Sequence, residues 1–152
     1  MTENALSVAL AYTAAIEEKN RDAIEKLLHD DVRIIFPISA APTGRPEGIF
    51  LGKDEALAYM DAIFSKFIHL RWPDPDWTLS ADGTRAFMQG RGDAVVTHSG
   101  VPYRNAYIVR IDVHDGLITQ IMEYANGVLY MALQIPPTEV EIRAVHRVAD
   151  QE

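Results

Sequence analysis

The chain has 152 residues, a hydrophobic content of 48% and a formal net charge of -8, which predicts one globular domain with a single core. The acidic balance disfavours nucleic acid and anionic membrane surfaces as partners, because both select basic patches. There is no cysteine, so disulfides and thiol chemistry are excluded. No apolar run approaches the roughly 20 residues of a membrane span, and the start of the chain lacks a basic signal region, so we expect a cytoplasmic protein.

The first forty residues predict a helix, a short helix and a strand. Residues 2–18 carry an apolar stripe at helical spacing, with Thr2 as the expected N-cap; the stripe consists of Ala5, Val8, Ala9, Tyr12 and Ile16. Asn20 is expected to cap a second helix that runs to His29. Residues 32–38 are rich in β-branched side chains and predict a strand that ends near Pro37.

The middle of the chain predicts a long loop, a helix and two interrupted strands. Residues 39–52 contain two prolines and three glycines and indicate a loop. Residues 53–67 predict a third helix with a broad apolar face. Residues 69–79 predict a strand broken by Pro73 and Pro75, since proline cannot donate to a strand ladder.

Residues 84–98 predict the next strand, and the glycines within it indicate a bulge or a bend. Phe87, Gln89, Arg91 and Asp93 alternate on one face of this strand. Such a face either lines a pocket or lies outside, carrying salt bridges or a subunit contact, and the second interpretation is favoured.

A hairpin is the strongest local pattern in the sequence. Residues 101–113 and 117–126 are β-rich runs that flank a short turn containing Asp115-Gly116. Tyr103, Asn105 and Tyr107 share one face of the first run with Val109 and Ile111, and Glu123 shares a face of the second run with Thr119 and Ile121. Polar groups among apolar β-branched residues fit a small buried reaction site and need partners when buried. Residues 127–133 then predict a last short helix or a turn.

The hairpin resembles the SnoaL-like branch of the NTF2-like superfamily, which includes ketosteroid isomerases, polyketide cyclases and phenazine-biosynthesis proteins. The matching elements are Tyr103-x-Asn105-x-Tyr107, Asp115-Gly116-x-Ile118 and Glu123-Tyr124-x-Asn126. The resemblance implies an α+β, NTF2-like (cystatin-like) cone, in which a bent, mostly antiparallel sheet wraps around three helices from the N-terminal half. It also implies a homodimer formed through the outer face of the sheet. We expect one such domain over residues 1–135 and a C-terminal tail over 136–152, either helical or frayed.

Glu123 is the first candidate for catalysis. A carboxyl group on a buried strand face should have a raised pKa and could act as an acid or base near neutrality, and the resemblance to phenazine-biosynthesis proteins assigns the matching Glu that role. The alternative is a Glu that only ties strands together. Tyr12 matches the oxyanion-donating tyrosine of ketosteroid isomerases, or is a core tyrosine. Asn105 and Tyr107 could bind an oxygen of the ligand or satisfy Glu123.

The sequence also departs from the relatives. Ketosteroid isomerases carry their general-base Asp just before a proline on the first strand, where this chain has Phe36. A second oxyanion-hole acid and the Asp-Arg-Asp set of limonene-epoxide hydrolase are not evident. Steroid isomerisation by that mechanism is therefore disfavoured.

An apolar pocket for a small molecule is expected beside the candidate catalytic residues. Its predicted substrate-binding lining is Phe36, Met60, Phe64, Trp72, Phe87 and Tyr103. The histidines lack metal-ligand spacing, so we expect no metal and no cofactor. The leading hypothesis is a cofactor-independent lyase or isomerase for a small hydrophobic oxygenated molecule, such as an aromatic, polyketide or terpenoid intermediate. The alternatives are a dehydratase or cyclase that uses the same pocket, and a non-catalytic dimeric module that binds a small molecule.

Overall fold

The computed structural model of the chain describes residues 4–38 and 47–150, with side chains placed up to residue 146. Its helices are α1 (Ala5–Glu17), α2 (Arg21–Leu27), α3 (Gly52–Lys66), α4 (Gly127–Met131) and α5 (Glu139–Asp150). Its strands are β1 (Leu28–Phe36), β2 (Gly48–Leu51), β3 (Phe67–Arg71), β4 (Asp76–Leu79), β5 (Arg85–Arg91), β6 (Asp93–Val96), β7 (Pro102–Tyr103), β8 (Ala106–His114) and β9 (Leu117–Ala125).

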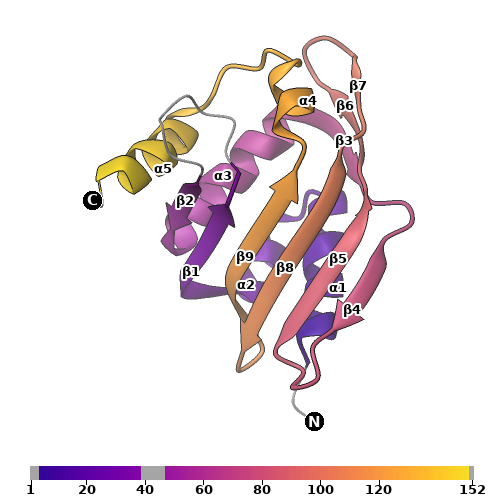
Figure 1. Cartoon of the computed structure of the whole chain (residues 1–152), viewed down its shortest axis with the longest axis vertical. Helices are drawn as coiled ribbons and strands as arrows, with labels where there is room; N and C mark the ends of the chain where they lie inside the picture. Colours follow the sequence, from indigo (N-terminus) through magenta and orange to yellow (C-terminus); the bar gives the residue numbers. More distant parts are fainter. Residues whose placement is uncertain (1–3, 39–46, 151–152) are drawn as a thin grey trace.

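Two sheets and a layer of helices make up the molecule. The larger sheet has the order β2-β1-β9-β8-β5-β4, and the smaller one has the order β3-β6-β7. Within these described strands, β1 and β9 pair in parallel and every other pair is antiparallel. Helices α1, α2 and α3 lie on one face of the larger sheet (Figure 1). The expected α+β fold, with a mostly antiparallel sheet wrapped around three helices, is confirmed.

Asparagine side chains start the first two helices. The Asn4 side chain accepts a hydrogen bond from the Ser7 N–H at 3.0 Å, so Asn4 is the N-cap of α1; the expected cap, Thr2, lies outside the described residues. Asn20 caps α2 as predicted, by accepting from the Ala23 N–H at 3.1 Å. Helix α2 ends earlier than expected, because the chain is already extended at Leu28.

The segment expected to be one loop contains a strand. Strand β2 pairs antiparallel with β1, from Phe36 opposite Gly48 to Arg33 opposite Leu51. Residues 39–46 lie outside the described part of the chain. Gly52, which opens α3, has a φ of 84°, a left-handed conformation that only glycine adopts without strain.

Two long predicted strands are each split where the chain passes from one sheet to the other. Residues 84–98 divide into β5 and β6 at Gly92, and residues 101–113 divide into β7 and β8 at Arg104–Asn105. The two breaks meet, because the Gly92 N–H donates to the Asn105 carbonyl at 2.9 Å. The bend expected from the glycines is therefore a change of sheet. The predicted interruption between β3 and β4 is confirmed at 72–75.

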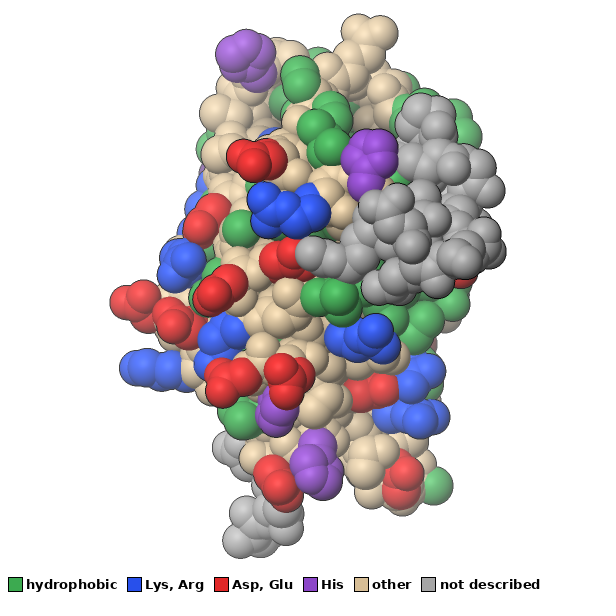
Figure 2. Space-filling view, turned by 90° about the vertical axis from the view of Figure 1, so that its left-hand side faces the viewer, with side chains coloured by type: hydrophobic (Ala, Val, Ile, Leu, Met, Phe, Trp, Pro, Cys, Tyr) green, Lys and Arg blue, Asp and Glu red, His purple; other side chains and the backbone are tan. Residues whose placement is uncertain are grey.

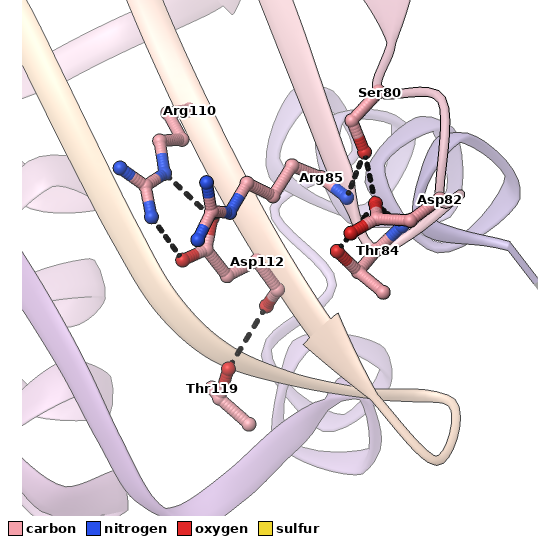
Figure 3. Close-up of polar contacts among 7 residues, drawn as sticks. All are labelled: Ser80, Asp82, Thr84, Arg85, Arg110, Asp112 and Thr119. Atoms are coloured by element: carbon pink, nitrogen blue, oxygen red, sulfur yellow. Dashed lines mark hydrogen bonds and ion pairs between the residues drawn. The ribbon is translucent and has the colours of Figure 1, made fainter.

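The outer face of the larger sheet carries polar contacts. Arg110 binds Asp112 through two hydrogen bonds of 2.8 and 2.7 Å, and the Arg85 guanidinium lies 3.8 Å from the same carboxylate (Figure 3). In the β4–β5 turn, hydrogen bonds from Ser80 and Thr84 lower the pKa of Asp82 to about 2. The favoured interpretation of the β5 face as an outer face with salt bridges agrees with this arrangement.

Acidic and basic side chains are interspersed on the described surface that Figure 2 shows. In the described part of the chain, no helix combines the length and apolar character that crossing a bilayer requires.

Candidate functional site

A cavity of about 650 Å³ lies between the helices and the inner face of the larger sheet. Each strand of that sheet contributes to its lining, and the contributing side chains include Phe50, Phe36, Glu123, Tyr107, Met88 and Trp77 in the order of the strands. Tyr12 of α1 and Tyr59 and Met60 of α3 line it from the helical side. This volume suits a small, largely apolar ligand.

Glu123 is the central ionisable group of the cavity. It lies opposite Val109 in the β8–β9 register, and Ile121, Glu123 and Ala125 all line the cavity because alternate residues of a strand share a face. Burial raises the pKa of Glu123 to about 7. No hydrogen bond to its carboxyl group is recorded from any described residue, so nothing offsets the cost of burying the charge. The group can therefore give or take a proton near neutral pH.

Five of the six tyrosines line the same cavity; they are Tyr12, Tyr59, Tyr103, Tyr107 and Tyr130. Burial, and secondly the charge of Glu123, raises the pKa of Tyr12, Tyr59 and Tyr107. These phenols stay protonated at any physiological pH and act as hydrogen-bond donors. Among the described residues, the Tyr12 hydroxyl has only a long contact of 4.0 Å with the Met60 Sδ, so it can turn to a ligand.

Asn105 lies behind the cavity wall and is fully buried. Its Oδ1 accepts from the Ala106 and Asn126 N–H groups at 2.8 and 3.0 Å, and its Nδ2 donates to the Asn126 carbonyl at 3.0 Å and to the Tyr103 hydroxyl at 2.6 Å. These four bonds use the full capacity of a side-chain amide. Asn105 therefore has no group left for a ligand, and it holds Tyr103 instead.

Gly92 makes room for Tyr107. A Cβ atom at position 92 would lie 2.7 Å from the Cε2 atom of the Tyr107 ring, which is closer than real side chains approach. The glycine thus lets the ring lie against the backbone where β5 passes into β6. The same ring meets Trp72 edge to face, with centroids 6.2 Å apart.

Aromatic rings form two opposite walls around Glu123. Phe36, Phe50 and Tyr59 pack together on the side of β1 and β2, with centroids 4.6 to 6.0 Å apart. Trp72 and Tyr107 stand on the side of β8 and β5. The Trp72 Nε1 atom is buried and has no hydrogen-bond partner among the described residues, so it is a second unused donor near the cavity.

A buried ion pair fastens α5 beside the cavity. The Lys66 Nζ donates to both carboxylate oxygens of Glu141, at 2.5 and 2.8 Å, and to the Tyr130 hydroxyl at 3.0 Å. Glu141 also accepts from the Thr138 N–H at 2.7 Å at the start of α5. Because the Lys66 charge is neutralised by Glu141, it does not offer a free cation to an anionic ligand.

The structure brings together seven of the ten residues predicted for the site: Glu123, Tyr12, Tyr107, Phe36, Met60, Trp72 and Tyr103 all line the cavity. Three predictions are corrected. Phe64 packs into the core beside the cavity. Phe87 points outward because it alternates with the buried Ala86 and Met88. Asn105 makes all four of its hydrogen bonds with protein groups and not with a ligand.

Sequence reasoning missed Tyr59, Tyr130 and Glu141. Tyr59 directly precedes Met60 on α3 and could have been found from its place on that helix. Tyr130 and Glu141 line the cavity because of the path that the chain takes after β9, and no local sequence pattern predicts that path. Among the described residues, no group of three His, Asp or Glu side chains is arranged to hold a metal ion.

Comparisons with known proteins agree with this architecture. Residues 9–121 match the family model of the SnoaL-like domain. The uncharacterised protein YesE of Bacillus subtilis strain 168 is 30% identical over 125 residues, which cover 82% of each chain. The crystal structure of an isomerase candidate from Bacillus subtilis matches with a TM-score of 0.71 and 27% identity, over 82% of this chain and 88% of that one. A polyketide cyclase candidate from Xanthomonas campestris matches in fold, with a TM-score of 0.70 and 21% identity over 84% and 94% of the chains.

Proposed function

The chain belongs to the SnoaL-like domain family of the NTF2-like superfamily, and on this premise we propose that it is a cofactor-independent acid/base enzyme, a lyase or isomerase. Its proposed substrate is a small, largely apolar molecule that carries oxygen. The observation that carries the proposal is Glu123, a carboxyl group with a pKa of about 7 in an apolar cavity.

In the proposed reaction, the Glu123 carboxylate takes a proton from a carbon next to a carbonyl group. The C–H electron pair forms the new C=C bond, and the carbonyl π electrons move to the oxygen, which gives an enolate. Return of the proton to another carbon is an isomerisation, whereas expulsion of a leaving group is a lyase or dehydratase reaction. A base with a pKa near the working pH is effective at this step, and tyrosine donors can stabilise the enolate oxygen.

The cavity favours this function over a non-catalytic binding module. A module should have its carboxylate satisfied by protein donors, because an unsatisfied buried charge only costs stability. Glu123 instead lines the cavity, and no hydrogen bond to it is recorded within the described chain. Groups held at such a cost are concentrated at functional sites.

A solvent exchange experiment tests the proposal without knowledge of the natural substrate. The probe is 2-acetonaphthone, a flat apolar methyl ketone, dissolved in D2O with the protein at neutral pD. We expect the protein to accelerate deuterium entry into the methyl group, as followed by NMR. Glu123→Gln should remove the acceleration and keep the fold, because Gln is similar in size but cannot accept the proton.

Tyr124→Phe is the matched control, since Tyr124 is 40% exposed and lies on the strand face opposite that of Glu123. It should exchange at the wild-type rate. Equal exchange rates for wild type and Glu123→Gln would refute the proton transfer, and bound ketone without any exchange would favour the binding module.

A further inference from the structure

Two of the cavity tyrosines differ from the others, because their hydroxyl oxygens are held by groups that can only donate. A phenol oxygen that accepts a hydrogen bond from an obligate donor must direct its own proton elsewhere. Tyr103 and Tyr130 are in this position. Each side chain lines the cavity. Within the described chain no carbonyl or carboxylate accepts either proton, and the Tyr107 hydroxyl is the group besides Asn105 that shares a hydrogen bond with Tyr103.

For Tyr103 the obligate donor is the Asn105 amide. Because Asn105 Oδ1 accepts from two backbone N–H groups, the amide cannot be turned over, and the Nδ2 atom must be the one 2.6 Å from the Tyr103 oxygen. Burial raises the pKa of Tyr103, while its hydrogen bonds with Asn105 and with the Tyr107 hydroxyl lower it. A phenol oxygen that accepts from an amide becomes a stronger donor through its own O–H, which can turn to Tyr107 or to a ligand.

For Tyr130 the obligate donor is the ammonium group of Lys66, at 3.0 Å. An ammonium has no acceptor site, and the bidentate contact with Glu141 keeps it in place. The Tyr130 proton is thus also directed away from Lys66.

The two rings lie side by side. Their centroids are 6.0 Å apart in an edge-to-face arrangement, and Tyr103 is stacked on Phe67 at 5.4 Å. Asn105 connects both tyrosines, because its bonds to the Asn126 backbone fix the residue that caps α4, the helix that carries Tyr130. Packing and hydrogen bonds therefore preorganise both hydroxyls before a ligand enters.

We propose that Tyr103 and Tyr130 form a two-hydroxyl clamp for a carbonyl oxygen, with Asn105 as its positioning residue, so that the substrates are ketones or aldehydes with an acidic C–H beside the carbonyl. The inference rests on the proposed function for the part played by Glu123. The clamp itself is a binding site, and it can be tested in a protein that catalyses nothing.

The test compares two ligands of one shape. One is 2-acetonaphthone, whose carbonyl can only accept, and the other is 2-isopropenylnaphthalene, in which a CH2 group replaces the oxygen. Affinities are measured by fluorescence titration for wild type, Tyr103→Phe, Tyr130→Phe and the control Tyr124→Phe. The carbonyl stretching frequency of the bound ketone is recorded by infrared difference spectroscopy.

We expect wild type and Tyr124→Phe to prefer the ketone, and each clamp variant to lose about fivefold of that preference, the usual effect of one neutral hydrogen bond. Affinity for the alkene should not change. The carbonyl stretch should move to higher frequency in each clamp variant, which a merely structural role would not cause. Thermal melting shows whether each variant is folded. If one of the two clamp variants does not fold, the other alone is enough for the test.

Unchanged ketone preference and carbonyl frequency in a folded clamp variant would overturn the inference, as would the absence of any preference in wild type. The two proposals fail separately. A ketone preference that depends on the tyrosines, without deuterium exchange, would keep the clamp and remove Glu123 from catalysis, whereas exchange that survives both tyrosine variants would do the opposite.

Discussion

Asn105 and Asn126 are joined by a pair of reciprocal hydrogen bonds, in which the Asn105 Nδ2 donates to the Asn126 carbonyl and the Asn126 N–H donates to the Asn105 Oδ1, both at 3.0 Å. The Asn126 side chain in turn accepts from the N–H groups of Val128 and Leu129 at the start of α4. One buried amide thus ties the end of β9 to the crossing between β7 and β8. The position of the Tyr103 hydroxyl depends on the same amide.

Asn105→Ala should lower the free energy of unfolding by about 3 kcal/mol, because it leaves several buried backbone groups without partners at about 1 kcal/mol or more each. Asn105→Asp should be no better, since a carboxylate cannot donate to Tyr103 or to the Asn126 carbonyl. Urea unfolding measures both. Asn20→Ala, which removes an exposed cap, is the control and should cost about 1 kcal/mol. A loss below 0.5 kcal/mol in Asn105→Ala would contradict this account of the amide.

Asn105 also shows what the sequence could and could not predict. The two-residue period correctly placed a polar residue inward between Tyr103 and Tyr107, because side-chain direction in a strand is a local property. Two of its four hydrogen bonds join it to Asn126, 21 positions away, and no local sequence pattern predicts a partner at that distance. The hypothesis of a catalytic amide was therefore reasonable from the sequence and is replaced by a structural role in the fold.

The errors at Phe87 and in the strand boundaries have one physical origin. Apolar alternation shows that two faces exist, but the face that becomes the inside depends on which layer the strand joins. Phe87 is apolar and points outward, while Ala86 and Met88 are buried. In the same way, the strands on the two sides of Gly92 belong to different sheets, but in the sequence they form one continuous β-rich run. Glu123 and Tyr12 were placed correctly because period and family resemblance indicated the same face.

Gly92→Ala should destabilise the protein by about 1 to 3 kcal/mol, since the added methyl group would overlap the Tyr107 ring, and overpacking has this effect. Chemical denaturation gives the loss. The adjacent exposed change Arg91→Ala is the matched control and should stay within about 0.5 kcal/mol. If the two variants proved equally stable, Gly92 would not be required for the position of the ring.

Lys66→Met should cost about 3 kcal/mol, because it leaves the Glu141 carboxylate partly buried without its cation. Only 5% of the Lys66 side chain and 16% of the Glu141 side chain are exposed. Adding Glu141→Gln to Lys66→Met should restore part of the loss, since the orphaned charge is then gone. Arg143→Ala removes more exposed contacts and should change little. Thermal and urea unfolding of wild type, Lys66→Met, Glu141→Gln and the double variant measures the coupling, and the two single losses should not add, because the side chains are in contact.

The outer sheet face carries exposed apolar side chains at Phe87, Ile108 and Tyr124, and we propose that a second copy of the chain covers it, as the family resemblance implies. Ile108 is 50% exposed and faces Tyr124 across the β8–β9 ladder. Ile108→Glu should shift the protein from dimer to monomer in sedimentation equilibrium, because a charge in a dry interface lacks a partner. Val128→Glu, at a 78% exposed position on α4, should leave the dimer intact. A monomeric wild type at high concentration would refute the proposal.

Glu123 should make the protein less stable as the pH rises. Its pKa is raised from 4.5 to about 7 by burial, so between these values the folded state holds a proton that the unfolded state has lost. The stabilisation is complete below pH 4.5 and is lost as the pH rises through about 7, with a total of about 3 kcal/mol at 1.36 kcal/mol per pKa unit.

Glu123→Gln does not titrate, so the variant should gain up to about this amount over wild type between pH 4.5 and pH 8. Urea unfolding of both proteins across this range measures the gain, and taking their difference cancels all other titrating groups. The control Glu18→Gln, at an exposed site, should show no such trend. If the stability difference between wild type and Glu123→Gln were constant with pH, the Glu123 carboxyl group would titrate in the folded protein as it does in water.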